Sequence, residues 1–283
     1  MCCDTHEAQA RGTTVATATD IQPIDPAADR PAYKQIADQL RVEIADGVFK
    51  PGQKLPSVTQ LMHEFAASRA TVGRALTLLR NEGRVRAERG VGVFVREARP
   101  LVFLKPSDRF DRKHREAGLA PLQVDAEAQG LSVKQEILKL EEVPAPADIA
   151  EHLGLNEGEM VFVRRRLVRL GRKASPDDQC RPAQLADSYL PMDIATGKIR
   201  EMDSGSGGTY ARIEEQGNLL THFTEDLSFR MPSPYEARLL QLDAGVPVID
   251  LTRVAYAGSR AVECFTSVIA GDKYSIEYRI KAH

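Results

Sequence analysis

The fold of the N-terminal part is decided by the stretch from Ser57 to Gly83, which reads SVTQLMHEFAASRATVGRALTLLRNEG. Its first four residues have capping-box spacing, in which a serine caps a helix and a glutamine three residues later bonds back. We therefore expect a short helix from Ser57 to about Phe65, followed by a tight break at 66–68. Ser68 can cap another helix ending at Gly83, with one apolar stripe made of Val72, Ala75, Leu76 and Leu79.

The segments on either side complete a familiar order of elements. Upstream, apolar residues from Tyr33 to Ile44 recur at helical spacing, and Gly47 follows as a stop. Downstream, Val85 to Val95 is typical of a small hairpin with glycines at its tip. The order helix, helix, tight turn, helix, hairpin is that of a winged helix-turn-helix, a DNA-binding module.

The distribution of charge agrees with a DNA-binding module. The 283-residue chain has a net charge of −2, but residues 31–98 hold eleven Lys or Arg against seven Asp or Glu. A basic patch on a near-neutral chain is the expected footprint of one nucleic-acid-binding domain. The alternative for such an arginine run is an ordinary solvated face.

Helical geometry indicates which side chains would face a duplex. With the apolar stripe turned inward, Ala70 and Arg74 lie on the opposite face of the helix. Ser68, Arg69 and Thr71 occupy its first turn, where free backbone N–H groups favour phosphate. An arginine here can bind a guanine edge or hold a phosphate, and one at the hairpin tip can enter the minor groove.

Residues 31–95 resemble the winged helix-turn-helix of GntR-type bacterial transcription regulators. The matching stretches are PAYKQI at 31–36, FKPGQKLPS at 49–57, SRATV at 68–72, AL at 75–76 and GVGVFV at 90–95. The resemblance implies DNA contacts by Ser68, Arg69, Thr71 and Gly90. Together with the geometry, it gives these candidate DNA-binding residues: Ser57, Thr59, Ser68, Arg69, Ala70, Thr71, Arg74, Arg89 and Gly90.

Two positions depart from the family pattern. The family often has arginine where this chain has Thr59 and Gly73. Arg74 could replace the arginine missing at Gly73, but it lies 100° further around the helix. The resemblance therefore does not carry over the operator sequence.

The rest of the chain predicts a second domain. Strand-like segments occupy 137–143, 160–170, 184–190, 247–256, 262–270 and 274–280, with helices at 146–153 and 209–216 and another starting at Ser233. Short turns between strands favour a largely antiparallel sheet with helices on it, an α+β domain. We thus expect a disordered arm at 1–30, the DNA-binding domain at 31–98, a Pro-interrupted linker at 99–136 and the second domain at 137–283.

No sequence pattern of an enzyme is present. The six histidines and four cysteines lack metal-ligand spacing, and the chain has no phosphate-loop or nucleophile-elbow motif. We expect no catalytic residue, no metal and no cofactor. The run Ser204-Gly205-Ser206-Gly207-Gly208 before a helix could cradle an anion, or it could be only a turn.

Residues from about 137 to 281 resemble the UTRA effector-binding domain of the HutC subfamily of GntR regulators. Short collinear motifs carry the resemblance, among them VRRR at 163–166, ADSYLP at 186–191, GTY at 208–210 and GVPV at 245–248. It implies a chorismate-lyase-like fold used for sensing. It also implies a pocket whose effector-binding residues are Arg164, Arg166, Gly208, Thr209, Tyr210, Glu263 and Tyr274.

The chemistry of these residues agrees with a ligand pocket. Two arginines on one strand face and a helix start form an anion site, and Glu263 can accept a hydrogen bond from a hydroxyl or amine. The alternative is a solvent-facing arginine strand with Glu263 in a salt bridge. The loop at 171–182 is longer than is usual in the family and could reshape the pocket mouth.

The sequence therefore predicts a cytoplasmic, homodimeric transcription regulator, most simply a repressor. It would bind a two-fold double-stranded DNA operator and a small, anionic effector. We expect no membrane association, since no apolar run is long enough to span a membrane. Two alternatives stay open. One is a constitutive dimeric DNA-binding protein with a degenerate pocket, and the other is an enzyme of chorismate-lyase-like fold.

Overall fold

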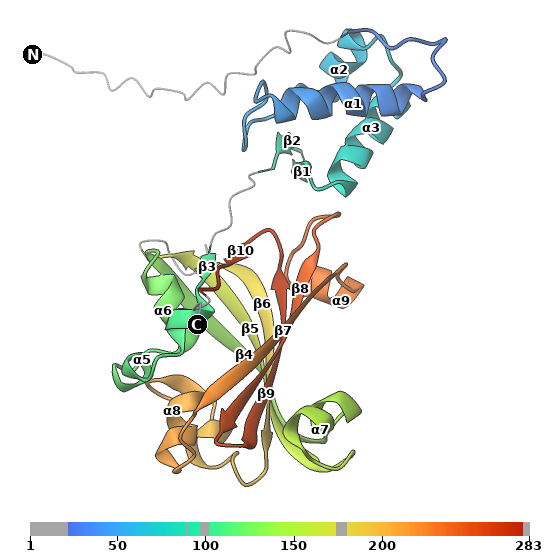
Figure 1. The fold of residues 1–283 in the computed structure, drawn as a ribbon. Coiled ribbons are helices and arrows are strands. Elements are labelled where there is room, and N and C mark those ends of the chain that lie inside the picture. Colours follow the sequence, from blue (N-terminus) through green and yellow to red (C-terminus); the bar gives the residue numbers. More distant parts are fainter. Residues whose placement is uncertain (1–21, 89, 97–101, 174–179, 280–283) are drawn as a thin grey trace, which may run out of the picture. The chain divides into compact units, whose positions relative to one another are not determined.

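The computed structural model describes residues 22–88, 90–96, 102–173 and 180–279. The chain divides into two units, residues 1–98 with 243–245 and residues 99–242 with 246–283, and each is described by itself (Figure 1). Most of the predicted N-terminal arm lies outside the described residues. Within those ranges, no helix is long and apolar enough to cross a membrane.

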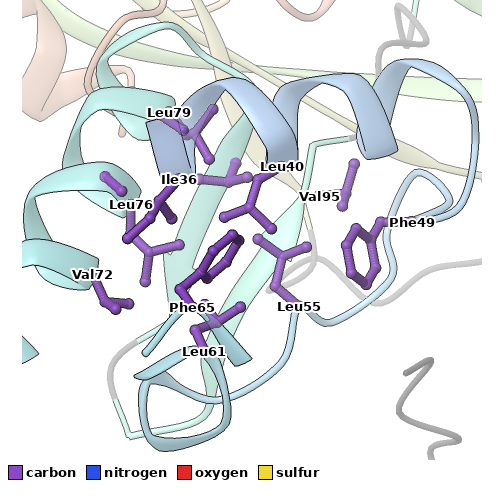
Figure 2. Packing of buried hydrophobic residues seen from close by; sticks show 13 residues of the cluster. Ile36, Leu40, Phe49, Leu55, Leu61, Phe65, Val72, Leu76, Leu79 and Val95 are labelled. Carbon is purple, nitrogen blue, oxygen red and sulfur yellow. The ribbon is translucent and has the colours of Figure 1, made fainter. Parts of the chain in front are cut away.

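The first unit is the predicted winged helix-turn-helix. Its elements are α1 (Ala32–Ala45), α2 (Val58–Glu64), α3 (Arg69–Asn81), β1 (Val85–Glu88) and β2 (Gly92–Val95), the last two paired as an antiparallel hairpin. Figure 2 shows side chains from all three helices meeting in one core, where the following are buried: Ile36, Leu40, Phe49, Leu55, Leu61, Phe65, Val72, Leu76, Leu79 and Val95. Each buried side chain of this kind contributes about 1.5–3 kcal/mol.

Local hydrogen bonds set the turn between α2 and α3. Ser57 Oγ accepts from Gln60 N at 3.2 Å, and Gln60 Oε1 accepts from Ser57 N at 2.8 Å, which is the predicted capping box. At the other end of α2, Ala66 takes the left-handed conformation (φ 49°) that usually calls for glycine. Ser68 Oγ then caps α3 by accepting from Thr71 N at 3.2 Å. These bonds hold the start of α3 in place.

The second unit contains a six-stranded antiparallel sheet with strand order β4-β5-β6-β9-β8-β7, as expected for an α+β domain. The strands are β4 (Leu131–Pro144), β5 (Met160–Arg172), β6 (Arg181–Pro191), β7 (His222–Arg230), β8 (Val248–Ala257) and β9 (Arg260–Ala270). The helices around it are α7 (Ala147–Leu153), η2 (Gly197–Arg200), α8 (Gly208–Glu215) and α9 (Pro234–Leu239). Strand β7 and η2 are absent from the sequence prediction.

Residues 99–136 differ from the prediction of a linker. Their described part carries β3 (Val102–Leu104), α4 (Pro106–Arg109), α5 (Arg112–Glu116), α6 (Pro121–Glu127) and the start of β4. Pro121 occupies the first turn of a helix, where proline is tolerated, so it does not interrupt structure. Three of the charged residues in this segment are buried in ion pairs: Arg109 with Asp125, and Arg115 with Glu214 of α8. The segment is folded into the second unit.

The last predicted strand is shorter than expected and lies outside the main sheet. Only Tyr274–Ile276 forms β10, which pairs in parallel with β3. β3 has only three residues, so the alternating apolar and polar residues after Ile276 have no strand there to pair with.

Candidate DNA-binding face and ligand cavity

The predicted DNA-facing residues lie on the solvent side of α3. Val72 and Leu76 are buried in the core, whereas Arg69, Ala70 and Arg74 are exposed. The N-terminal turn of α3 is exposed as well, so its free backbone N–H groups are accessible to a phosphate.

Arg69 and Arg74 have side chains that are free to bind. Among the described residues, neither guanidinium makes a hydrogen bond or an ion pair. Arg86 differs, because it pairs with Glu88 and its guanidinium lies 5.0 Å from the ring centroid of Phe94. The basic run therefore contains both structural arginines and arginines that are available for a partner.

The remaining candidates fall at the start of α2 and on the wing. Ser57 and Thr59 are exposed, but the Ser57 hydroxyl is already engaged in capping α2. Gly90 is exposed at the hairpin tip with φ +76°, a conformation that favours glycine. Arg89 lies outside the described residues.

A cavity of about 370 Å³ lies on one face of the six-stranded sheet. Arg164, Ser188, Phe265 and Arg253 are consecutive cross-strand neighbours on β5, β6, β9 and β8. Because directly paired residues point to the same face of a sheet, these four side chains share the face that lines the cavity. Residues of α6 and α8, on one side of the sheet, also line the cavity, while α7 packs on the opposite face (Figure 1).

Arg164 holds the segment that leads into α8. Its Nη1 donates to the carbonyl oxygens of Ile199 and Glu201, and its Nη2 donates to that of Met202 at 3.4 Å. Burial, together with the nearby charge of Arg166, lowers the pKa of Arg164 to about 10. This arginine therefore fixes the segment that precedes the Gly-rich run at 204–208.

Arg166 and Glu263 bring unsatisfied polar atoms to the same cavity. Arg166 Nη2 donates to Ser188 Oγ, but its Nε is buried and, within the described part of the chain, has no hydrogen-bond partner. Glu263 Oε2 is likewise buried without a partner there. Buried polar groups are nearly always hydrogen-bonded, so this pair is suited to a ligand that accepts at one end and donates at the other.

The start of α8 closes one side of the cavity, as the Gly-rich run suggested. Gly207 and Gly208 have φ of +78° and +69°. A Cβ on Gly207 would lie 2.7 Å from Ala211 Cβ and 3.1 Å from the Arg115 carbonyl oxygen. Only glycine fits this approach. The Gly208 N–H donates to the Gly205 carbonyl oxygen at 3.0 Å, so an anion at this helix start would bind the N–H groups that follow Gly208. Thr209 and Tyr210 line the cavity too.

Tyr210 is a buried hydroxyl beside Glu263. Burial and then the charge of Glu263 raise the pKa of Tyr210 above its ordinary value. Tyr210 therefore stays protonated and can donate a hydrogen bond at neutral pH.

Tyr274 is the predicted pocket residue that does not line the cavity. It is 5% exposed and packs in a core cluster with Val102 and Leu104. Its place on β10, beside β3 rather than in the main sheet, explains this position.

Two arginines that line the cavity, Arg109 and Arg253, were not anticipated as pocket residues from the sequence. Arg109 Nη2 lies 3.3 Å from Glu225 Oε1, and Arg253 lies 2.6 Å from the same oxygen. Arg109 also pairs with Asp125 at 3.2 Å. No local signal could reveal this network, because its members are up to about 140 residues apart in the sequence.

In the described part of the chain, no group of three or more His, Cys, Asp or Glu side chains is arranged to hold a metal ion. The two described cysteines, Cys180 and Cys264, are buried free thiols.

Comparison with known proteins agrees with both units. The UTRA domain family matches residues 128–275, and the gntR family of bacterial regulatory proteins matches residues 32–95. A Streptomyces coelicolor HTH-type transcriptional regulator is 31% identical, across 89% of this chain and 93% of its own length. The transcriptional repressor NagR of Bacillus subtilis is 26% identical, across 87% and 93%.

The solved structures give the same result. PhnF from Mycobacterium smegmatis is 25% identical, with a TM-score of 0.54, across 88% of this chain and all of that one. The matched families and relatives are transcription regulators and not enzymes. The chain therefore belongs to the GntR family of bacterial regulatory proteins, in the HutC-like group that carries a UTRA domain after the winged helix-turn-helix.

Proposed function

We propose that this chain is a homodimeric transcription repressor whose affinity for its operator changes when a small anionic effector occupies the cavity. Several relatives are named as repressors, among them NagR and the histidine utilization repressor of Pseudomonas putida, 26% identical across 88% of this chain. The observation that carries the effector part is the pair of buried, unpartnered atoms, Arg166 Nε and Glu263 Oε2.

The DNA-binding part of the proposal rests on α3. Its exposed face carries Arg69 and Arg74 with free guanidinium groups, which would enter the major groove. Ser68, Arg69 and Thr71 would bind phosphate at the helix start, and the wing with Arg89 and Gly90 would approach the minor groove. Two copies would bind the two halves of a two-fold operator.

The effector class follows from the groups that line the cavity. Arg166 and the start of α8 suit a phosphate, phosphonate or carboxylate, and Glu263 suits a hydroxyl or amine on the same molecule. A volume of about 370 Å³ fits a small molecule. The relatives' names refer to different systems, such as histidine utilization and mannosyl-D-glycerate transport, so no effector is transferred from them.

An effector can regulate only if it binds the DNA-competent and incompetent arrangements with different affinity. Coupling of about 1–3 kcal/mol is typical, which corresponds to about a 5- to 150-fold change in operator affinity. A constitutive DNA-binding protein would show no such change.

The test combines ligand binding with operator release. Sugar phosphates, phosphonates and hydroxy- or amino-carboxylates are screened by thermal shift, and every compound that stabilises the protein is added to its complex with upstream DNA. We expect at least one of them to change operator affinity within the range above, and Glu263→Gln to reduce that response without changing DNA affinity. If compounds bind and none changes operator affinity, the regulated repressor is wrong and the constitutive alternative holds.

A further inference from the structure

We propose that the free edge of β7 pairs antiparallel with β7 of a second copy, so that two six-stranded sheets join into one, with Leu227 at the two-fold axis. This inference rests on the homodimer of the proposed function and names its surface. β7 is an outer strand of the sheet and pairs with β8 over nine residues without a register shift. In the described ranges, its backbone makes no hydrogen bond to another backbone beyond that pairing. An edge of this kind is a template for another strand.

The opposite edge of the sheet is protected against such pairing. β4 has a register shift between Ile137 and Lys139, which indicates a bulge. Charged side chains follow along the same strand, including Lys139, Glu141 and Glu142. Bulges are a usual feature that prevents edge-to-edge association. β7 also carries charged residues, Glu225, Asp226 and Arg230, but it has no bulge.

Exposed apolar side chains gather at the end of β7. Phe229 is 73% exposed, Met231 60% and Tyr235, in the first turn of α9, 52%. Tyr278, whose hydroxyl bonds to Glu225 of β7 at 2.6 Å, is exposed as well. Phe229 on β7, Met231 directly after it and Tyr278 beside Glu225 therefore mark an interaction site at this edge of the sheet.

Symmetry and charge discriminate among the registers centred near the middle of β7. A two-fold axis perpendicular to the sheet pairs even-numbered residues with even-numbered ones and odd-numbered residues with odd-numbered ones, because residues directly opposite each other point to the same face. An axis at Asp226 would place two carboxylates directly opposite, which is unfavourable. An axis at Ser228 would add the partner's Asp226 carboxylate to Arg230, which already contacts Asp250 and Glu236.

An axis at Leu227 avoids both conflicts. It pairs Leu227 with its own copy and Asp226 with Ser228 of the partner subunit, whose hydroxyl can donate to the carboxylate. It also brings the partner's Phe229 opposite Glu225, next to the exposed ring of Tyr278. The apolar patch and the unpaired edge are then covered together.

Cysteine cross-linking tests this register in the full-length chain with Cys2 and Cys3 changed to serine. Directly opposite residues have Cα atoms about 4.5–5.5 Å apart, within the reach of a disulfide. The double variant Asp226→Cys/Ser228→Cys is therefore expected to form a covalent dimer under mild oxidation. Each single variant is the matched control and is expected to stay uncross-linked, because its two cysteines would be offset by two residues along the strands.

A second pair of variants tests the surface without cysteine chemistry. Phe229→Asp should weaken self-association at least tenfold in sedimentation equilibrium, whereas Met160→Asp, on an exposed residue at the start of β5, should leave it unchanged. If the chain is a dimer but no variant cross-links, or a single variant does, or Phe229→Asp stays dimeric, this interface is wrong and the repressor stands. If the unmodified chain is a monomer on its operator, the homodimer of the proposed function is wrong as well.

Discussion

Arg164 and Arg166 lie on the same face of β5, yet Arg164 donates to three backbone carbonyls while Arg166 donates to one serine hydroxyl. Arg164 thus holds the loop before α8, and Arg166 keeps donor capacity for a ligand. We expect Arg164→Met to lower the free energy of unfolding by roughly 1–3 kcal/mol, since it leaves the carbonyl of the buried residue Ile199 unpaired and releases the segment up to Met202. Arg166→Met should abolish the effector response with a smaller loss of stability. Urea unfolding and effector titration of both variants check this, and equal losses of stability would contradict the division of roles.

Arg69 is predicted to contribute strongly to the affinity for the operator. Its guanidinium is exposed at the start of α3 and has no partner within the described residues, so its removal costs the fold nothing. Arg69→Ala should reduce specific operator affinity by about 1–3 kcal/mol, roughly 5- to 150-fold, with unchanged unfolding and self-association. Fluorescence anisotropy with operator DNA measures this. Arg260→Ala, which removes an exposed cation that pairs with Asp193, is the control in the second unit, and equal losses of operator affinity in both variants would refute the role.

Gly73 offers a stability test of α3. The residue is helical, has no positive φ, and a Cβ there would meet nothing within 4 Å. Gly73→Ala should therefore raise the free energy of unfolding by about 0.5–1 kcal/mol. Gly83, just past the helix, has φ +69°, and Gly83→Ala should destabilise the protein. Thermal unfolding measures the change in stability of both variants, and a change of the same sign in both would contradict the end of α3 before Gly83.

The ion pair of Glu236 with Arg230 predicts a pH dependence of stability. Hydrogen bonds from the Arg230 guanidinium lower the pKa of Glu236 to about 2, from 4.5. A depressed pKa stabilises the fold above the unfolded-state value, and this contribution is lost as the pH falls from about 4.5 towards 2. Glu236→Gln should be less stable than the parent at pH 7 by roughly 0.5–1 kcal/mol, the range for a solvent-screened pair. The difference should shrink in unfolding measured down to pH 3, and a constant difference would contradict it.

The first unit could be predicted from the sequence because its signals are local. The capping box at Ser57 and the cap at Ser68 each involve residues three apart, and the structure contains both. The apolar stripe from Val72 to Leu79 can also be recognised from the residues of a single helix. Such patterns do not depend on the rest of the chain.

The second unit could be predicted only in part, for the opposite reason. Arg164 and Arg166 fall on one face of a strand by simple alternation, and both line the cavity. β7 was not predicted because its sequence, HFTEDLSFR, contains many charged and polar residues and few of the apolar residues that mark a strand. Such a composition is possible because β7 lies at the edge of the sheet. The folding of residues 102–136 depends on pairs such as Arg109 with Glu225, which only the three-dimensional structure brings together.

The central claim, that this chain reads a specific operator, is tested most directly by its binding to its own upstream DNA across a salt series with random duplex as competitor. Phosphate contacts alone give an affinity that falls steeply with salt and ignores sequence. The account predicts that binding to the upstream DNA survives at physiological salt and exceeds binding to random duplex by about 10³-fold or more. Equal affinity for both duplexes, lost together as salt rises, would show that the face around Arg69 and Arg74 is only electrostatic and would contradict the account.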